Sequence, residues 1–467
     1  MNVNRRKSLK FLKKYHYHIK QTMRLAVPVV IGQVGHVMMG VVDNAMVGRV
    51  GPVPLAAAAI GNSLFFTVMV VGIGMSYALS PLTAMAAGRK DTEECGTVFR
   101  QAFYINALTA AVLLSVTYFG AYLIVYLDQP AEVRELAIPY MQTLAFSAVP
   151  LMLFQQLRQF IEGLSIMKPA MYITLLANGV NAFANWILIY GNLGFPEFGL
   201  VGAGYATIVS RVFMALMITG FVVSNHKFRI YSLNPFPVKI ERKQSLRILK
   251  LGGGSASQYF FEVTAFSLAA VMVGWLGAIQ LASHQIAISI ASVTYMITVG
   301  ISSAAAIRVG NYLGQGNPGE TRSAGIAALI LGASVMAGFA VILVILNTFL
   351  PTLYISDREV IVQASILLLI AALFQVFDGT QAVGLGVLRG IADVKIPTII
   401  TFVAYWAIGL PGAYLLGFTF SFGVEGIWAA LSLALAVSAG LLTRRFLKMT
   451  KLRENRTIYE TVHDGKR

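Results

Sequence analysis

Three acidic residues, Asp43, Glu262 and Asp378, lie inside long apolar stretches of the sequence. A carboxylate within a lipid bilayer is costly unless it faces the protein interior or a water-filled cavity, so such residues commonly mark an ion or substrate pathway. Removal from water also favours the neutral form of a carboxyl group, so that a proton or a metal cation can discharge it. We therefore expect reversible binding of H⁺ or Na⁺ here, with Glu262 and Asp378 as the candidate Na⁺ ligands.

Polar side chains accompany the acids, or gather within residues 168–191, at the 3.6-residue period that places them on one helix face. Carboxylate, amide and hydroxyl oxygens suit protons and hard cations better than soft transition metals. We predict that the following residues line a cavity or bind substrate: Gln33, His36, Asn178, Asn181, Asn185, Gln258, Tyr259, Phe374 and Gln381. Two plainer interpretations stay open: the asparagines as hydrogen-bonding contacts between helices, and His36 as a packed, neutral histidine.

The composition indicates an integral membrane protein. Of 467 residues, 57% are hydrophobic and 12% are charged, and the mean hydropathy is +0.71. Apolar runs long enough to cross roughly 30 Å of hydrocarbon as helices recur along the whole chain. We predict twelve transmembrane helices, near residues 23–47, 53–85, 98–126, 136–157, 168–191, 200–224, 247–275, 278–307, 322–349, 360–388, 396–418 and 424–443. The single Cys95 allows no internal disulfide and no cysteine-based metal site, and we expect no cofactor.

The net charge of +16 is distributed as in a membrane protein rather than a nucleic-acid-binding protein. Lys and Arg gather in both termini and in the 226–250 connection. They also gather in the loops that connect an even-numbered predicted helix to the next odd-numbered one, to which we assign Arg89, Lys90, Arg308, Arg322, Arg389 and Lys395. The opposite loops hold only Arg49, Arg134 and Arg358. By the positive-inside rule, this asymmetry predicts an even number of helices with both termini in the cytoplasm. The plasma membrane is the expected location, where the basic ends of the chain contact anionic lipids.

Short motifs recur in the same order in both halves of the chain. Val47-Gly48-Arg49-Val50-Gly51 corresponds to Val273-Gly274-Trp275-Leu276-Gly277, and Gly88-Arg89-Lys90-Asp91 corresponds to Gly314-Gln315-Gly316-Asn317. We therefore predict an all-α integral membrane fold of twelve transmembrane helices in two pseudo-symmetric six-helix lobes. The predicted segments are a basic cytoplasmic N-terminus (1–22), an N-lobe (23–225), a cytoplasmic linker (226–246), a C-lobe (247–448) and a cytoplasmic tail (449–467). Pro28 is expected to kink the first helix and to act as a hinge.

These features indicate a secondary transporter that exchanges an organic cation for Na⁺ or H⁺ at a buried acid. A charge that crosses 100 mV is worth about 2.3 kcal/mol, which corresponds to roughly fifty-fold accumulation. A flippase for lipid-linked saccharides could share the two-lobe plan, but its anionic cargo favours a cavity lined by Arg and Lys. Arg211, inside the predicted sixth helix, fits that alternative, and its plainer interpretation is a structural salt bridge. Neither a nucleophile with its base nor a metal-ligand triad indicates an enzyme, and the repeated halves favour alternating access over a channel.

The sequence resembles the multidrug and toxic compound extrusion (MATE) transporters, and within them the NorM branch, over residues 20–448. The most specific motifs are Leu25-Ala26-Val27-Pro28 leading to Val42-Asp43, Phe260-Phe261-Glu262-Val263-Thr264, and Asp378 followed by Gly386-Val387-Leu388-Arg389-Gly390 and Asp393. Asn181 and Asn185, ahead of Trp186 and Tyr190-Gly191, are similar to the asparagine pair that neighbours the first-helix aspartate in that family.

The resemblance implies export of cationic, amphipathic drugs and dyes in exchange for Na⁺ or H⁺, and thereby antibiotic resistance. It also implies a C-lobe cation site at Glu262 and Asp378, and an N-lobe site at Asp43 with the two asparagines. Phe374 stands where a relative that uses an aromatic hydroxyl near the cation has Tyr. We expect the protein to work as a monomer, because one chain supplies both lobes.

Overall fold

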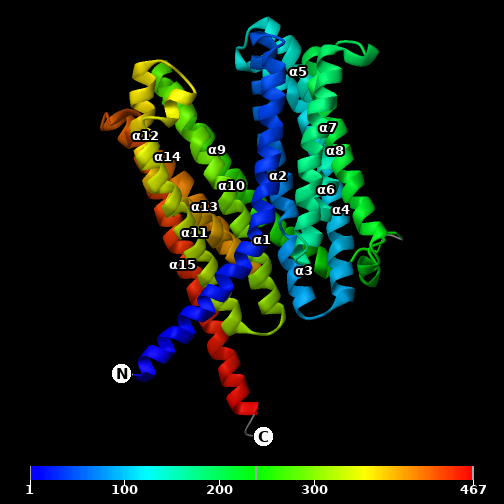
Figure 1. Ribbon diagram of the computed structural model, residues 1–467, viewed down its shortest axis with the longest axis vertical. Coiled ribbons are helices and arrows are strands. Elements are labelled where there is room, and N and C mark those ends of the chain that lie inside the picture. Colours follow the sequence, from blue (N-terminus) through cyan, green and yellow to red (C-terminus); the bar gives the residue numbers. More distant parts are fainter. Residues whose placement is uncertain (1, 237–238, 465–467) are drawn as a thin grey trace. The chain divides into compact units, whose positions relative to one another are not determined.

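The computed structural model describes residues 2–236 and 239–464, with side chains for residues 13–236 and 239–455. Figure 1 shows the course of the helices. The elements of the first half are α1 (Asn2–Gly48), α2 (Pro52–Ser76), α3 (Leu79–Gly88), α4 (Thr92–Gly120), η1 (Ala121–Leu127), α5 (Ala131–Phe146), α6 (Ala148–Gly163), α7 (Lys168–Tyr190), η2 (Asn192–Gly194), α8 (Gly199–Ser224) and η3 (His226–Tyr231).

The second half of the chain continues in the same way. Its elements are α9 (Arg242–Leu276), α10 (Ala278–Gly314), α11 (Pro318–Leu346), η4 (Leu350–Leu353), α12 (Arg358–Gly390), α13 (Lys395–Phe402), η5 (Val403–Gly409), α14 (Leu410–Tyr414), η6 (Leu415–Thr419) and α15 (Gly423–Asp464). The described residues form twelve helical stretches that are long and apolar enough to cross a membrane. This confirms the predicted number. Four of the stretches combine consecutive elements, namely α2 with α3, α4 with η1, α5 with α6, and α13 through η6.

The helices form two compact units, and the boundaries of these units differ from the predicted lobe boundaries. One unit comprises residues 31–259, and the other comprises residues 1–30 together with residues 260–467. The division therefore falls inside α1 and inside α9 rather than in the connection at 226–246. The local reason is that each long helix packs in two places. Val30 of α1 lies beside Gly300 of α10, whereas Ala256 of α9 lies beside Gly74 of α2.

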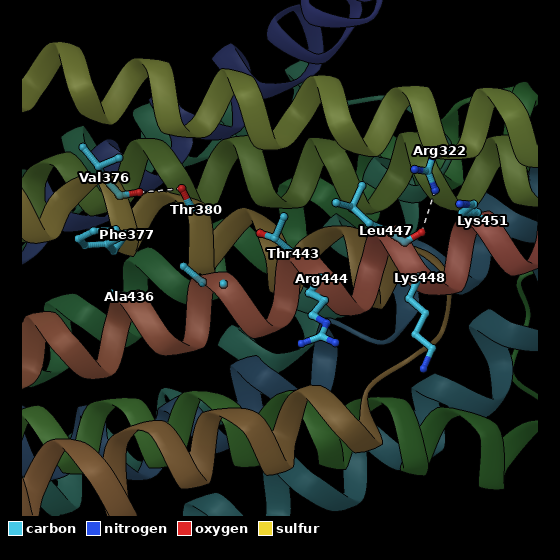
Figure 2. A pocket seen from close by; sticks show the side chains of 12 residues that line it. Arg322, Val376, Phe377, Thr380, Ala436, Thr443, Arg444, Leu447, Lys448 and Lys451 are labelled. Atoms are coloured by element: carbon cyan, nitrogen blue, oxygen red, sulfur yellow. Dashed lines mark hydrogen bonds between the residues drawn. The ribbon is translucent and has the colours of Figure 1, made fainter.

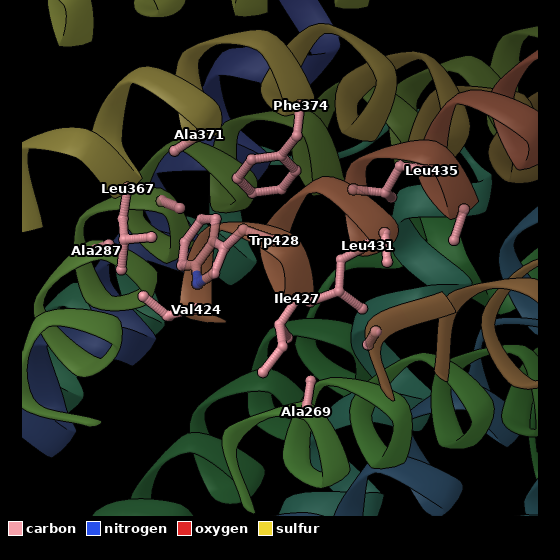
Figure 3. Close-up of a cluster of buried hydrophobic side chains, with 14 of the residues drawn as sticks. Ala269, Ala287, Leu367, Ala371, Phe374, Val424, Ile427, Trp428, Leu431 and Leu435 are labelled. Carbon is pink, nitrogen blue, oxygen red and sulfur yellow. The ribbon is translucent and has the colours of Figure 1, made fainter. Parts of the chain in front are cut away.

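Each unit has its own apolar core. In the unit of residues 31–259, small and large side chains from α2, α5 and α8 pack together around the buried Tyr140. In the other unit, α12 packs against α10, α11 and α15. Figure 3 shows part of that core, where Trp428 of α15 lies between the side chains of Leu367 and Phe374 of α12 and Ala287 of α10. These cores hold the polar residues described below at defined positions on their helices.

Turns at corresponding places in the two halves have the same local structure. Asp91 caps α4 by accepting a hydrogen bond from a first-turn amide at 2.8 Å, and Asn317 caps α11 in the same way at 3.1 Å. Such caps satisfy amides that the helix itself leaves free. Ser165 after α6 and Ala392 after α12 both adopt the left-handed conformation, with φ of 64° and 59°. The repeated motifs of the sequence therefore correspond to repeated structure.

Several basic residues assigned to loops lie within helices. The predicted helices end at 157 and 307, whereas α6 ends at Gly163 and α10 ends at Gly314. Arg308, Arg322 and Arg389 lie within α10, α11 and α12, so their assignment to loops is wrong. The reason for Arg308 is visible in the structure: its guanidinium donates to the main-chain oxygen of His18 at 2.6 Å, which allows the charge to be buried.

The predicted terminal segments are continuous with helices. Residues 2–22 form the first part of α1, which runs unbroken through Pro28, and residues 449–464 form the end of α15. The rest of the predicted tail, residues 465–467, lies outside the described residues. Lys14 and His18 of α1 pair with Glu320 of α11 at 2.8 and 2.9 Å. These contacts hold the N-terminal part of α1 in the unit of residues 260–467.

Candidate ion-coupling and substrate sites

Asp43 of α1 lies in a polar cluster within the unit of residues 31–259. Its Oδ1 accepts a hydrogen bond from Asn185 Nδ2 at 2.6 Å, and Thr207 Oγ1 of α8 lies 3.5 Å from Oδ2. Asn185 also reaches Asn181 Oδ1 at 3.3 Å, one turn earlier on α7. All four side chains are buried, and Asn181 also hydrogen-bonds the Asp43 carboxylate. The structure therefore brings together the three residues predicted for this site.

A buried arginine neighbours this cluster. Arg211 lies one helical turn after Thr207 on α8, and its guanidinium donates to Ser147 Oγ and stacks over the Phe65 ring at 4.9 Å. Arg211 interacts electrostatically with Asp43 but forms no ion pair with it among the described residues. The plainer interpretation of Arg211, a structural salt bridge, therefore finds no ion pair within 4.0 Å among the described residues. A serine hydroxyl and an aromatic face receive its charge instead.

A second charged group in the same unit lies on α6. Arg158 Nε and Glu162 Oε1 are 2.7 Å apart, and their side chains are only 8% and 2% exposed. Arg158 also donates to Gln33 Oε1 of α1 at 3.4 Å, so the predicted cavity residue Gln33 belongs to this ion pair rather than to the Asp43 cluster. The predicted helix end at 157 concealed this pair. The i, i+4 spacing of opposite charges next to an apolar run is the signal that could have revealed it.

The other two acids lie together in the unit of residues 260–467. Gln381 Nε2 of α12 lies 3.5 Å from Glu262 Oε2 of α9, and the Tyr405 hydroxyl of η5 donates to Gln381 Oε1 at 2.7 Å. Tyr295 of α10 also hydrogen-bonds the Glu262 carboxylate. Asp378, one turn before Gln381, repels Glu262 electrostatically. Both carboxylates are buried, with exposed fractions of 7% and 6%.

This second site is rich in oxygen and contains an amide that lacks partners. Gln375, one turn before Asp378 on α12, is fully buried, and neither its oxygen nor its nitrogen has a hydrogen-bond partner among the described residues. Buried polar groups in native proteins are nearly always paired with protein, water or a ligand. Carboxylate, amide and phenol oxygens are ligands for hard cations. Within the described residues, no group of three or more His, Cys, Asp or Glu side chains is placed to hold a metal ion.

Comparison with known proteins places the chain in a family. The family model described as MatE matches the chain twice, over residues 28–187 and 255–415. The chain belongs to the MATE family. The protein called "Probable multidrug resistance protein NorM" from Mesorhizobium japonicum is 35% identical over 445 residues, which cover 94% of this chain and 95% of that protein. "Multidrug resistance protein MdtK" from Yersinia enterocolitica is 34% identical over 445 residues, which cover 94% and 97%.

The fold of this MATE protein also matches solved structures. The structure entitled "Crystal structure of MATE in the bent conformation" has a TM-score of 0.87 and 19% identity, and the match covers 96% of this chain and 99% of that one. "Crystal structure of eukaryotic MATE transporter AtDTX14" has a TM-score of 0.84 and 22% identity, with coverage of 95% and 99%. These matches, together with the double match of the family model, confirm the predicted fold class and the two repeated halves.

The remaining predicted residues of this MATE protein have other surroundings. Asn178 Nδ2 donates to the main-chain oxygens of Gly35 and Thr174, both at 2.9 Å, which is the helix-to-helix contact that was the plainer interpretation. Gln258 and Tyr259 lie on the part of α9 that belongs with residues 31–259, whereas Glu262 belongs to the other unit. The division between the two compact units therefore falls between Tyr259 and Glu262.

The last two predicted residues are Phe374 and His36. The Phe374 ring packs edge to face against Trp428, with 5.7 Å between centroids, inside the apolar core. Trp428 Nε1 also donates to His284 Nδ1 at 3.1 Å, so that histidine is packed against the same core. His36 lies on α1 in the unit of residues 31–259, one turn after Gln33, and its role stays a prediction.

Three residues near the acids were not predicted from the sequence. Tyr295 and Tyr405 contact the Glu262 site, and Thr207 contacts Asp43. Hydroxyl residues are common in transmembrane helices, so none of the three stands out in one sequence. The only signal for Thr207 is its position one helical turn before Arg211, because residues four apart share a helix face.

Proposed function

We propose that this MATE protein is a secondary antiporter that exports cationic, amphipathic drugs in exchange for Na⁺ or H⁺. The observation that carries the proposal is the pair of buried acids Glu262 and Asp378, which lie within electrostatic range of each other without a basic ion-pair partner among the described residues. The similar proteins are called multidrug resistance proteins, which supports the choice of cargo. Antibiotic resistance is the expected consequence for the cell.

The charge of the two acids explains why ions and drugs compete. Two carboxylates that share a buried site repel each other, and a proton or a cation bound between them relieves the repulsion. Na⁺ would find ligands in the oxygens of Glu262, Asp378 and Gln375, and a proton would bind a carboxylate directly. A cationic drug neutralises the same charge. Binding of the coupling ion therefore lowers the affinity for the drug, and this competition is the basis of exchange.

Asp43 provides a second acidic position, in the unit of residues 31–259. Burial disfavours its ionised form, whereas the hydrogen bonds from Asn185 and Thr207 and the nearby Arg211 favour that form. We propose that Asp43, with Asn181 and Asn185, forms the N-lobe site. The two acidic sites lie in different compact units, as the predicted alternation between two lobes requires.

We further propose that Pro28 is the hinge of α1. Proline lacks the amide that would bond the carbonyl one turn earlier, so the helix is weaker there than elsewhere. The boundary between the two compact units falls after Val30, two residues beyond the proline. The proposed location is the plasma membrane, with both termini in the cytoplasm and with one chain as the functional unit.

The test is transport by purified protein in liposomes. We expect Glu262→Gln and Asp378→Asn to abolish ethidium efflux driven by an ion gradient, because each keeps the side-chain volume but removes the exchangeable charge. Imposed Na⁺ and pH gradients are applied separately, and the gradient that drives wild-type efflux identifies the coupling ion. Glu425→Gln is the matched control, since Glu425 lies at the start of α15 and contacts Gln363 at 2.8 Å, away from both sites.

The outcomes are distinct. Efflux driven by one gradient in the wild type and in Glu425→Gln, and lost in both site variants, supports the proposal. Normal efflux from folded Glu262→Gln and Asp378→Asn would show that the acids are not the coupling site. If the wild type moves no cation under either gradient, drug antiport itself is refuted, and transport of a lipid-linked saccharide becomes the next assay.

A further inference from the structure

A groove of about 770 Å³ lies along α15, within the unit of residues 260–467. α11 contributes Arg322 to its lining, and α12 contributes Val376, Phe377 and Thr380. Figure 2 shows these side chains beside α15. The groove is separate from the acidic site, since its α12 residues are not those that bear the carboxylate and the amides. The α15 residues that line it are Ala436, Ala439, Gly440, Thr443, Arg444, Leu447, Lys448 and Lys451.

The two ends of the groove differ in chemistry. One end is apolar, and small residues such as Ala436 and Gly440 hollow it out between larger side chains of α12. Figure 2 shows the other end, where cationic side chains gather. None of the lining residues is acidic, and the cations are Arg322, Arg444, Lys448 and Lys451. A ligand that fits both ends has a hydrocarbon part and an anionic part.

The transition from apolar to cationic residues along α15 matches the boundary between the hydrocarbon core and the headgroups of a bilayer. From Gly423 to Thr443, α15 carries a single ionisable residue, Glu425. A helical stretch of this length rises about 30 Å, the thickness of the hydrocarbon core. Arg444, the next residue, therefore lies at the boundary between the hydrocarbon core and the headgroups. The apolar end of the groove lies at acyl-chain depth, and its cationic end lies at headgroup depth.

The cations are available to an external anion. Arg445, on a neighbouring face of α15, is neutralised by Asp393 at 2.8 Å. By contrast, Arg444, Lys448 and Lys451 take part in no ion pair among the described residues. Arg444 and Lys448 are exposed. Arg322 is held in place by the main-chain oxygen of Leu447 at 2.8 Å, so its charge stays at this end of the groove.

We propose that this groove is a binding site for one anionic phospholipid of the surrounding bilayer. The phosphate lies against Arg444 and Lys448, with Arg322 and Lys451 beside it, and an acyl chain lies over Gly440 and Ala436. A lipid with a net negative charge is favoured over a zwitterionic one, because the four cations have no acidic partner in the groove. The site goes beyond drug transport, since its lining residues on α12 and α15 are not those of the acidic site.

The first test removes the charge. Lipid binding to the purified full chain is measured by native mass spectrometry, with phosphatidylglycerol and phosphatidylethanolamine as probes. We expect the double substitution Arg444→Gln and Lys448→Gln to weaken phosphatidylglycerol binding about thirty-fold, the effect of two cations near a membrane surface. The matched control removes two exposed charges from η3, with Lys227→Gln and Arg229→Gln, and should bind like the wild type.

The second test fills the groove without touching a charge. A side chain added at Gly440 meets open space, with no other atom within 4 Å, so Gly440→Leu is expected to fold and to occupy the path of the acyl chain. We expect it to lose phosphatidylglycerol binding as the charge variant does. The proposal is overturned if both variants bind like the η3 control, or if phosphatidylethanolamine binds equally well. Displacement of the lipid by inorganic phosphate would also overturn it, because the site would then recognise a free anion.

Discussion

The buried pair of Arg158 and Glu162 makes a quantitative prediction. Both side chains are nine-tenths or more buried and their atoms are 2.7 Å apart, so each charge depends on the other for compensation. Removal of one partner leaves an uncompensated buried charge, whereas removal of both leaves none. We expect Arg158→Leu and Glu162→Leu each to destabilise the protein by about 3–5 kcal/mol. The double substitution should lower the free energy of unfolding less than either single substitution does, because two leucines fill a similar volume and leave no buried charge.

The assay is thermal unfolding of the three variants in detergent, followed by efflux measurements on those that stay folded. The expected order of Tm is wild type, then the double variant, then the two single variants. The double variant should also export drug at the wild-type rate, since Asp43, Glu262 and Asp378 are intact. The reasoning is refuted if the losses in the single variants add up in the double variant, because additivity means that the two charges do not compensate each other.

Two further predictions concern hydrogen bonds to charged groups. Asn185→Ala removes the donor at 2.6 Å from Asp43, a bond worth about 1.5–3 kcal/mol, and should slow ion-driven efflux roughly ten- to hundred-fold. Asn178→Ala is its control, because that amide bonds main-chain oxygens; equal rates for both would contradict the assigned role. Arg308→Met removes three contacts to α1 and should lower Tm and expose the N-terminal part of α1 to protease. Lys14→Ala breaks a partly exposed ion pair and should change Tm little, so equal effects of the two substitutions would refute this reasoning.

The class of protein could be read from the sequence because its signals are local. Hydropathy over about twenty residues is enough to identify a spanning helix, and all twelve predicted stretches reappear in the structure. The acids stood out for the same reason, since an ionisable residue within an apolar run needs no neighbour to be noticed. The correspondence of the two halves was visible in short motifs, and it was confirmed by the two matches of the family model.

The ends of the helices could not be read in this way. The fourth predicted helix stopped before Arg158, and the eighth stopped before Arg308, because a charge is normally a sign of the membrane boundary. In the structure, one charge is compensated four residues later on the same helix, and the other by the main chain of α1. The second compensation depends on a contact between residues almost three hundred positions apart, which no local pattern records.

The sequence by itself determined the membrane fold, its twelve helices, its repeat and the identity of the three acids, since hydrophobicity and helical period act over one or two turns. Only the tertiary structure decided which side chains surround those acids. It placed Asn185 and Thr207 on Asp43, added Tyr405 and Tyr295 to the Glu262 site, and gave Arg211 a hydroxyl and an aromatic ring. The rotation of each helix about its axis is set by packing against several others, so the partners of a buried polar group follow from the whole core.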